Sequence, residues 1–268
     1  MKIIDENIEN IKPFERLTDR EKKELFCNKC YEEHFIKKDG IIYHRRNNIP
    51  EFLLNELIGE LISEYFDIKT VKSILYKSND SFKYTLLTKL FTNNNENYSY
   101  IDKLFPNYQK REDIFNLNNL NKIYLNNKII NMNIDSHIKL LRELKKMIVL
   151  DYIIDNRDRV NINFIFNQDK DKVELKELFD FESAFTKITN KNYNVFKFNL
   201  NKKHDVKYLK NDEEFNELFE LALNLDINKI FKRLKDEYPI ILNSKDKLLY
   251  ESVIKKKQNE IKTYKLVK

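Results

Sequence analysis

Glycine is scarce in this chain: Gly40 and Gly59 are the only two glycines among 268 residues. A G-x-G-x-x-G dinucleotide fingerprint, a G-x-x-x-x-G-K-[ST] phosphate loop and a glycine-rich flap each need several glycines at close spacing. Two glycines so far apart can form none of these. Any phosphate group would therefore have to be held by side chains or by unusual backbone.

Cysteines and long apolar runs are also rare or missing. With only Cys27 and Cys30, the chain is not a disulfide-stapled secreted scaffold. Residues 1–12 mix charges with apolar side chains, and no apolar run approaches the roughly 18 residues that cross a bilayer. We therefore expect a cytoplasmic protein without a membrane span.

The charge balance is mildly basic but has no strongly basic block. Lys and Arg number 49 against 43 Asp and Glu, and the basic residues are interspersed along the chain. Nucleic-acid-binding domains gather basic residues on one face or stripe, so we do not expect nucleic acid as a direct partner. The 41% apolar content is enough for a packed core.

Local patterns in the first part of the chain predict a sheet and one helix. Asp39-Gly40 separates two apolar segments, 34–38 and 41–46, as in a hairpin with a type I′ turn. Apolar residues at helical spacing predict a helix over 51–66. Two more strands are expected over 71–76 and 82–91.

The second part of the chain is mainly helical by the same criteria. A strong helix is predicted over 135–154, a short hairpin pairs 163–166 with 173–179, and three helices follow over 212–268 with a break at Pro239. Asn93-Asn94-Asn95 is the most linker-like segment. We expect an α+β fold with these parts: an N-terminal helical extension, 1–26; a small sheet-containing lobe, 27–92; a hinge, 93–96; a larger helical lobe, 97–268.

The candidate chemistry lies around the second hairpin. Asp158 and Asn163 are on a loop after the buried helix, and Asp180 ends the following strand. Phosphoryl transfer uses such a set, with one carboxylate for the nucleophile and an Asn and an Asp for Mg²⁺. The five-residue spacing itself recurs by chance in this Asn-rich chain: Asp5/Asn10, Asp102/Asn107, Asp113/Asn118 and Asp151/Asn156.

At these residues the sequence resembles the HipA-like kinases. Residues 151–163 are similar to the family's D-Y-[IL]-x-x-N-x-D-R-H-x-x-N stretch, and residues 179–184 to its F/Y-D-x-x-S-[LA] motif. The resemblance implies a two-lobed kinase-like fold that binds ATP and Mg²⁺. It makes Asp158 the catalytic base and Asn163 and Asp180 the Mg²⁺ ligands.

The resemblance continues upstream of the linker. Residues 55–68 look like the family's αC helix, with Glu56 as the ion-pairing carboxylate, and residues 86–91 match the strand before the hinge. It implies that adenine lies against the backbone near Phe91 and Thr92. A basic residue on the preceding strand should pair with Glu56; we prefer Arg46 because it is always charged.

Three departures from the family pattern bear on activity. Val160 stands at the family's His position, Glu182 stands where many kinases have Gly, and residues 41–46 contain no Lys. His44, Arg45 and Arg46 all remain candidates for pairing with Glu56.

Three functions follow from these observations. The resemblance implies a Ser/Thr protein kinase, autophosphorylating or acting on another protein, of a kind that can be a toxin-like regulator with an antitoxin-like partner. The departures favour a pseudokinase that binds nucleotide with weak or no catalysis. The catalytic stretch is also similar to type II phosphatidylinositol 4-kinases, which implies a lipid kinase.

Separately, Cys27 and Cys30 have the spacing of half a zinc site, although structural zinc sites need a second tight pair.

Overall fold

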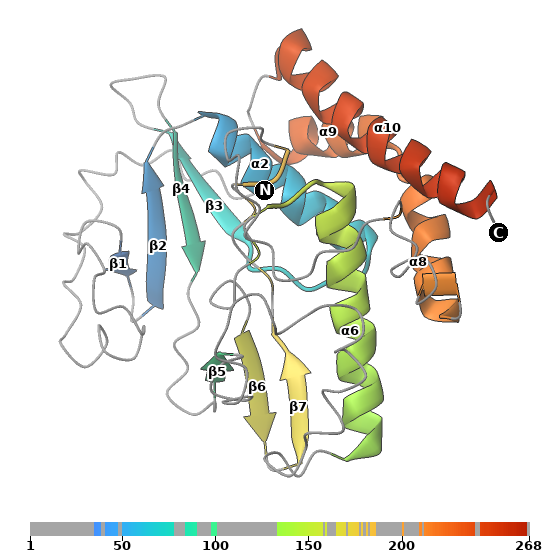
Figure 1. The fold of residues 1–268 in the computed structure, drawn as a ribbon. Coiled ribbons are helices and arrows are strands. Elements are labelled where there is room, and N and C mark those ends of the chain that lie inside the picture. The colour runs from blue at the N-terminus through green and yellow to red at the C-terminus, as the bar shows by residue number, and fades with distance from the viewer. Residues whose placement is uncertain are drawn as a thin grey trace.

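The computed structural model describes sixteen segments of the chain: 35–38, 41–47, 50–77, 84–89, 98–100, 133–157, 159, 165–169, 171–176, 178, 181, 183–185, 200, 209–210, 212–238 and 242–266. In these segments the protein combines two small antiparallel sheets with several helices (Figure 1). The expected mixture of helix and sheet is therefore confirmed. The proposed N-terminal extension, the hinge and the Cys27/Cys30 pair lie outside the described residues.

The first sheet has four strands in the order β1-β2-β4-β3. Its strands are β1 (Phe35–Lys38), β2 (Ile41–Asn47), β3 (Ser73–Lys77) and β4 (Tyr84–Lys89). Lys38 pairs with Ile41, so only positions 39 and 40 lie between β1 and β2. The hairpin expected from Asp39-Gly40 is confirmed.

Helix α2 (Pro50–Tyr65) follows β2 and matches the helix expected over 51–66. It is unusually buried: every residue from Leu53 to Ser63 is inaccessible or nearly so. Figure 1 shows the reason, because α2 lies between β3 and the helix α9 (Ile227–Glu237). A helix covered on both sides can bury its polar residues only when they have partners.

The second sheet has the order β5-β6-β7 and packs beside the helix α6 (Ile134–Ile153). Its strands are β5 (Tyr98–Tyr100), β6 (Ile165–Asp169) and β7 (Lys172–Leu175). The sequence predicted α6 and the β6–β7 hairpin but not β5. The Asn133 side chain caps α6 by accepting a hydrogen bond from the Ser136 N–H at 2.8 Å.

Three helices complete the fold and confirm the expectation for 212–268. They are α8 (Glu213–Leu223), α9 and α10 (Ser244–Leu266). Asp212 and Asp226 cap α8 and α9 by accepting backbone N–H bonds. Among the described residues, no helix is both long and apolar enough to cross a membrane.

A short backbone bridge links the two halves of the described chain. Thr70 and Leu178 form an isolated parallel bridge, in which the Val71 N–H donates to the Leu178 carbonyl and the Leu178 N–H donates to the Lys69 carbonyl. The segment before β3 is thereby tied to the segment that follows β7. This bridge places Leu178 beside the segment that joins α2 to β3.

Candidate functional site

The sequence-predicted site residues are only partly covered by the structure. Five of them lie outside the described residues: Asp158, Asn163, Asp180, Phe91 and Thr92. Arg46 lies on β2, where its backbone pairs with Leu86 of β4. Glu56 lies on α2 and is 1% exposed. The chain neighbours Arg159 and Phe181 are described, and they define the surroundings of the site.

Glu56 is bound to the segment that follows Asp180. Its carboxylate accepts a hydrogen bond from the backbone N–H of Phe181. Both residues are buried, so water does not compete for this hydrogen bond. The sequence predicted a functional carboxylate at Glu56, and the structure shows that this carboxylate holds the backbone beside a candidate metal ligand.

Gly59 allows Phe181 to approach α2. A Cβ atom at position 59 would lie 2.5 Å from Cγ and 2.6 Å from Cβ of the Phe181 side chain. Those distances are far below ordinary carbon–carbon contact, so no larger residue fits without movement. The sequence places Gly59 in a helix, where glycine is unfavourable, and the packing of Phe181 explains why it is there.

Replacing Gly59 by Ala is expected to lower the free energy of unfolding. Overpacking against Phe181 should cost about 1–3 kcal/mol, more than the roughly 1 kcal/mol that Ala gains in helix propensity. Urea denaturation of wild type and Gly59→Ala measures the difference. Phe181→Ala removes the ring and leaves only the contact with Cβ, so in that background the loss from Gly59→Ala should be smaller. A loss of equal size in both backgrounds would contradict the assignment.

The loop after α6 is built on a fully buried ion pair. The Arg159 guanidinium donates from Nε to Asp151 Oδ2 at 3.0 Å and from its Nη2 to Oδ1 at 3.1 Å. Asn156 adds a third bond, from its side-chain nitrogen to Asp151 Oδ1 at 2.9 Å. All three residues are buried. The Asp151/Asn156 spacing, which looked like chance in the sequence, is therefore a structural contact.

Arg159 also contacts Phe181. Its guanidinium lies over the Phe181 ring, 5.0 Å from the centroid, in a cation–π arrangement. Arg159 directly follows Asp158 in the chain, and Phe181 directly follows Asp180. The structure thus brings together Glu56, the residue after the candidate base and the residue after a candidate metal ligand.

A second set of charges borders the same loop. Asp155 has a positive φ of 50° and pairs with Arg157 at 2.6 Å. Lys257 of α10 lies 3.5 Å from Asp155 and 4.5 Å from the centroid of the Tyr152 ring. The Tyr152 hydroxyl donates to Glu260 at 2.5 Å, and burial together with this carboxylate raises the pKa of Tyr152. Helix α10 therefore fixes the start of the loop.

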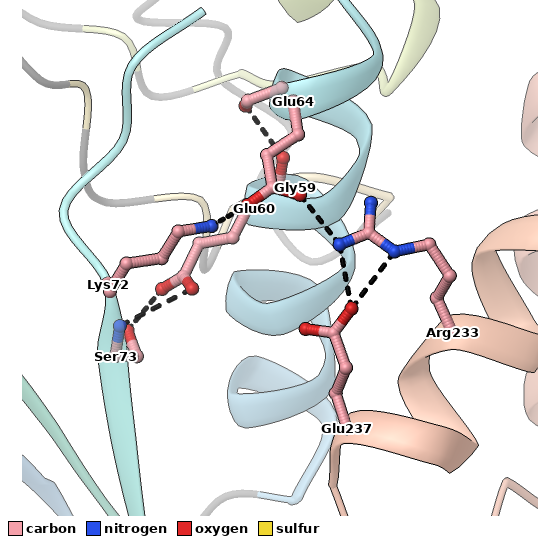
Figure 2. Close-up of polar contacts among 8 residues, drawn as sticks. Gly59, Glu60, Glu64, Lys72, Ser73, Arg233 and Glu237 are labelled. Atoms are coloured by element: carbon pink, nitrogen blue, oxygen red, sulfur yellow. Dashed lines mark hydrogen bonds and ion pairs between the residues drawn. The ribbon is translucent and has the colours of Figure 1, made fainter. Parts of the chain in front are cut away.

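Two further carboxylates of α2 link it to its neighbours (Figure 2). Glu60 accepts bonds from the Ser73 backbone N–H at 3.3 Å and from the Ser73 hydroxyl. Glu64 accepts from Lys72 and from the Arg233 guanidinium, the latter at 2.6 Å. Figure 2 shows Glu60 reaching toward β3, while Glu64 meets Arg233 of α9. One helix face thus carries three acceptors at successive turns, Glu56, Glu60 and Glu64.

Glu60 is expected to make stability fall as the pH rises. Burial, and secondarily the Glu56 charge, raises the pKa of Glu60 to about 8, while Ser73 and Lys72 oppose that shift. The folded protein keeps a proton that the unfolded chain loses, so the free energy of unfolding decreases from about pH 5 to about pH 8. Glu60→Gln stays neutral and should lose this slope. Urea denaturation across that pH range compares the two proteins; parallel curves would contradict the shift.

The described residues do not themselves form a metal centre. Among them, no cluster of three or more His, Cys, Asp or Glu side chains is arranged to hold a metal ion. The candidate Mg²⁺ ligands Asn163 and Asp180 lie outside these residues. Their amide and carboxylate oxygens are the donor type that Mg²⁺ prefers.

Comparison with known proteins identifies the fold. No protein-family model and no curated protein matches the sequence. Among solved structures, the chain is similar to the Helicobacter pylori proinflammatory kinase CtkA, with a TM-score of 0.60 and 17% identity over 86% of this chain and 91% of that one. The chain has the fold of the HipA-like kinases.

The HipA-like fold is supported by a second structure. HipA of Shewanella oneidensis, solved with HipB and its operator DNA, matches with a TM-score of 0.53 and 9% identity, over 86% of this chain and 58% of that one. The identities to both structures are low, and the motif resemblance was stated from residues 151–163 and 179–184, with further likeness over 55–68 and 86–91. The fold match confirms the recognition made from those motifs.

Within the HipA-like fold, sequence reasoning missed the residues that support the candidate site. Asp151, Asn156 and Arg159 are fixed letters of the motif, but the sequence gave no sign that they contact one another. Phe181 falls at a variable position of the second motif and had no assigned role. The signal for the first three residues was the motif itself, whereas Phe181 had none.

Proposed function

We propose that this protein is an ATP- and Mg²⁺-dependent kinase that phosphorylates a Ser or Thr hydroxyl of a protein, itself included. The observation that carries the proposal is the contact of Glu56 and Arg159 with Phe181. It brings α2 together with Arg159 and Phe181, which directly follow the motif residues Asp158 and Asp180 in the chain. The likeness to kinases of the HipA-like fold supports it.

The proposed arrangement has two lobes with the nucleotide between them. The first sheet and α2 belong to the small lobe, and the second sheet with α6 and α8–α10 to the large one. Adenine would lie along the backbone near Phe91 and Thr92. Because the chain lacks a glycine-rich flap, the phosphates would be held by side chains, with Arg46 as the preferred partner of Glu56.

Each motif residue then has a defined task. Asp158 accepts the proton of the acceptor hydroxyl as its oxygen bonds to the γ-phosphorus, and the bond to the β,γ-bridging oxygen breaks to release ADP. Asn163 and Asp180 would hold Mg²⁺, which neutralises charge on the phosphates. Glu56 fixes the backbone at Phe181 and so orients Asp180.

The alternative is a pseudokinase that binds nucleotide without transferring phosphate. Val160 at the family's His position and the absence of Lys from residues 41–46 favour it.

The likeness to HipA, which was solved with HipB and operator DNA, also supports a proposal that an antitoxin-like protein regulates this chain.

One experiment separates these functions. The purified chain is incubated with ATP labelled at the γ-phosphate and Mg²⁺, with itself, a cell lysate or vesicles containing inositol lipids as acceptor, and with a chelator as the metal control. Metal-dependent label on Ser or Thr supports the kinase. Label on lipid alone would show a lipid kinase. Nucleotide binding by calorimetry without transfer would show a pseudokinase.

A further inference from the structure

Tyr250 of α10 contacts both α2 and the segment that contains Phe185. Tyr250 of α10 is 1% exposed. Its hydroxyl donates to Oδ1 of Asn55 at 3.0 Å, and Asn55 is fully buried on α2. A buried bond of this kind favours one arrangement of α2 and α10. Moving the two helices apart would break the bond in a place where water cannot replace it.

The ring of Tyr250 meets the other part of the site. It packs edge-on against Phe185, with ring centroids 4.9 Å apart, and against Phe231 of α9 at 6.3 Å. Phe185 belongs to the segment after Asp180 and has a positive φ of 61°. Its backbone N–H donates to the carbonyl of Ile154, at the end of α6. A bulky residue keeps such a backbone only where its surroundings hold it.

These contacts lie next to the residues that act at the site. Asn55 immediately precedes Glu56 in the chain, and Phe185 comes four residues after Phe181. Tyr250 therefore contacts one residue beside Glu56 in the chain and one residue four positions after Phe181. The bond to Asn55 holds α2, and the ring contact holds Phe185.

We propose that Tyr250 is a positioning residue of the kinase site. It holds α2 and the segment Phe181–Phe185 in the register that lets Glu56 accept the Phe181 N–H. The proposal rests on the proposed function, since it concerns the same site. Assembly of the site then depends on α10, which supplies Tyr250.

The test removes only the hydroxyl. Tyr250→Phe keeps the ring on Phe185 but loses the bond to Asn55. Tyr264→Phe is the matched control, because Tyr264 is also buried on α10 but packs against Phe219 of α8. Amide hydrogen exchange of the full chain follows the peptides that contain 53–63 and 178–185, in the absence of nucleotide. Transfer assays give kcat and the KM for ATP, and circular dichroism confirms folding.

We expect Tyr250→Phe to exchange about tenfold faster in these two peptides, with little change in α8, because local opening reports local stability. Its kcat should fall about fivefold to tenfold, as expected for one buried hydrogen bond, with a smaller change in KM. In a Glu56→Ala background, which removes the acceptor of the Phe181 N–H, the loss from Tyr250→Phe should shrink, because the two residues act on one contact.

Four results would overturn the proposal. If Tyr250→Phe leaves amide exchange at 53–63 and 178–185 unchanged, or if Tyr264→Phe accelerates it equally, the Tyr250 hydroxyl does not position these segments. Faster exchange with a wild-type kcat shows that the contact does not matter to catalysis. If wild type transfers no phosphate, the proposed function fails first, and the exchange data then show whether the contact itself exists. A loss that persists in full in Glu56→Ala indicates a purely structural role.

Discussion

Asp158→Asn is expected to transfer phosphate about 10²–10⁴-fold more slowly than wild type, the usual contribution of a general base. The substitution keeps the size of the side chain and removes its ability to accept the acceptor's proton. Asp158 directly precedes Arg159, whose guanidinium is fixed by Asp151, so the backbone of the loop should survive the change. Nucleotide affinity should stay within about threefold, because the base does not hold ATP.

The matched control for Asp158 is Asp155→Asn on the same loop. Asp155 has a positive φ, which Asn tolerates well, and its ion pair with Arg157 is partly exposed. We expect its transfer rate to stay within about threefold of wild type, because a partly exposed pair contributes little. Initial rates with labelled ATP, together with calorimetric affinities, decide the matter. Equal rates for Asp158→Asn and wild type would remove Asp158 from the mechanism.

Asp151→Ala is expected to lower the free energy of unfolding by about 3–5 kcal/mol, because it leaves the Arg159 guanidinium buried without its carboxylate. Arg159 and Asp151 are both almost inaccessible, with side-chain exposures of 0% and 1%. Asn156 loses a hydrogen-bond acceptor at the same time. A loss of this size is a large part of the 5–15 kcal/mol that typical domains have in total.

Urea denaturation measures this loss, with Lys139→Ala as the control. Lys139 pairs with Glu174 on the surface, where both side chains are largely exposed, so its removal should cost at most about 1 kcal/mol. If Asp151→Ala does not fold, Asp151→Asn keeps the shape and tests the charge alone. A loss no larger than that of Lys139→Ala would show that the buried pair is not needed.

The local elements were predictable because their signals are local. Asp39-Gly40 fixes a hairpin by turn geometry, and the apolar spacing of residues 53–65 fixes α2. Strand β5 was missed because three residues make a strand only through their pairing with β6. The N-terminal extension, the lobe boundaries and the roles of Asp158, Asn163 and Asp180 remain predictions.

The contacts that support the candidate site were not predictable from patterns. Glu56 was singled out through the family resemblance, and composition alone would have placed it on a solvated face. Its partner, the Phe181 N–H, lies 125 residues away in the sequence. Lys257 of α10 is likewise only 15% exposed and contacts Asp155 and Tyr152. Such contacts depend on how helices pack, which periodicity does not encode.

The Asn55–Tyr250 bond also bears on the order in which the protein becomes functional. Its two residues are 195 positions apart, so α2 leaves the ribosome long before its partner is synthesised. Contacts of such long range form late, after the loop between them has closed. The nascent chain would thus carry α2 without its final register until α10 emerges. The contact that we propose to position the site can therefore form only after α10 has been synthesised.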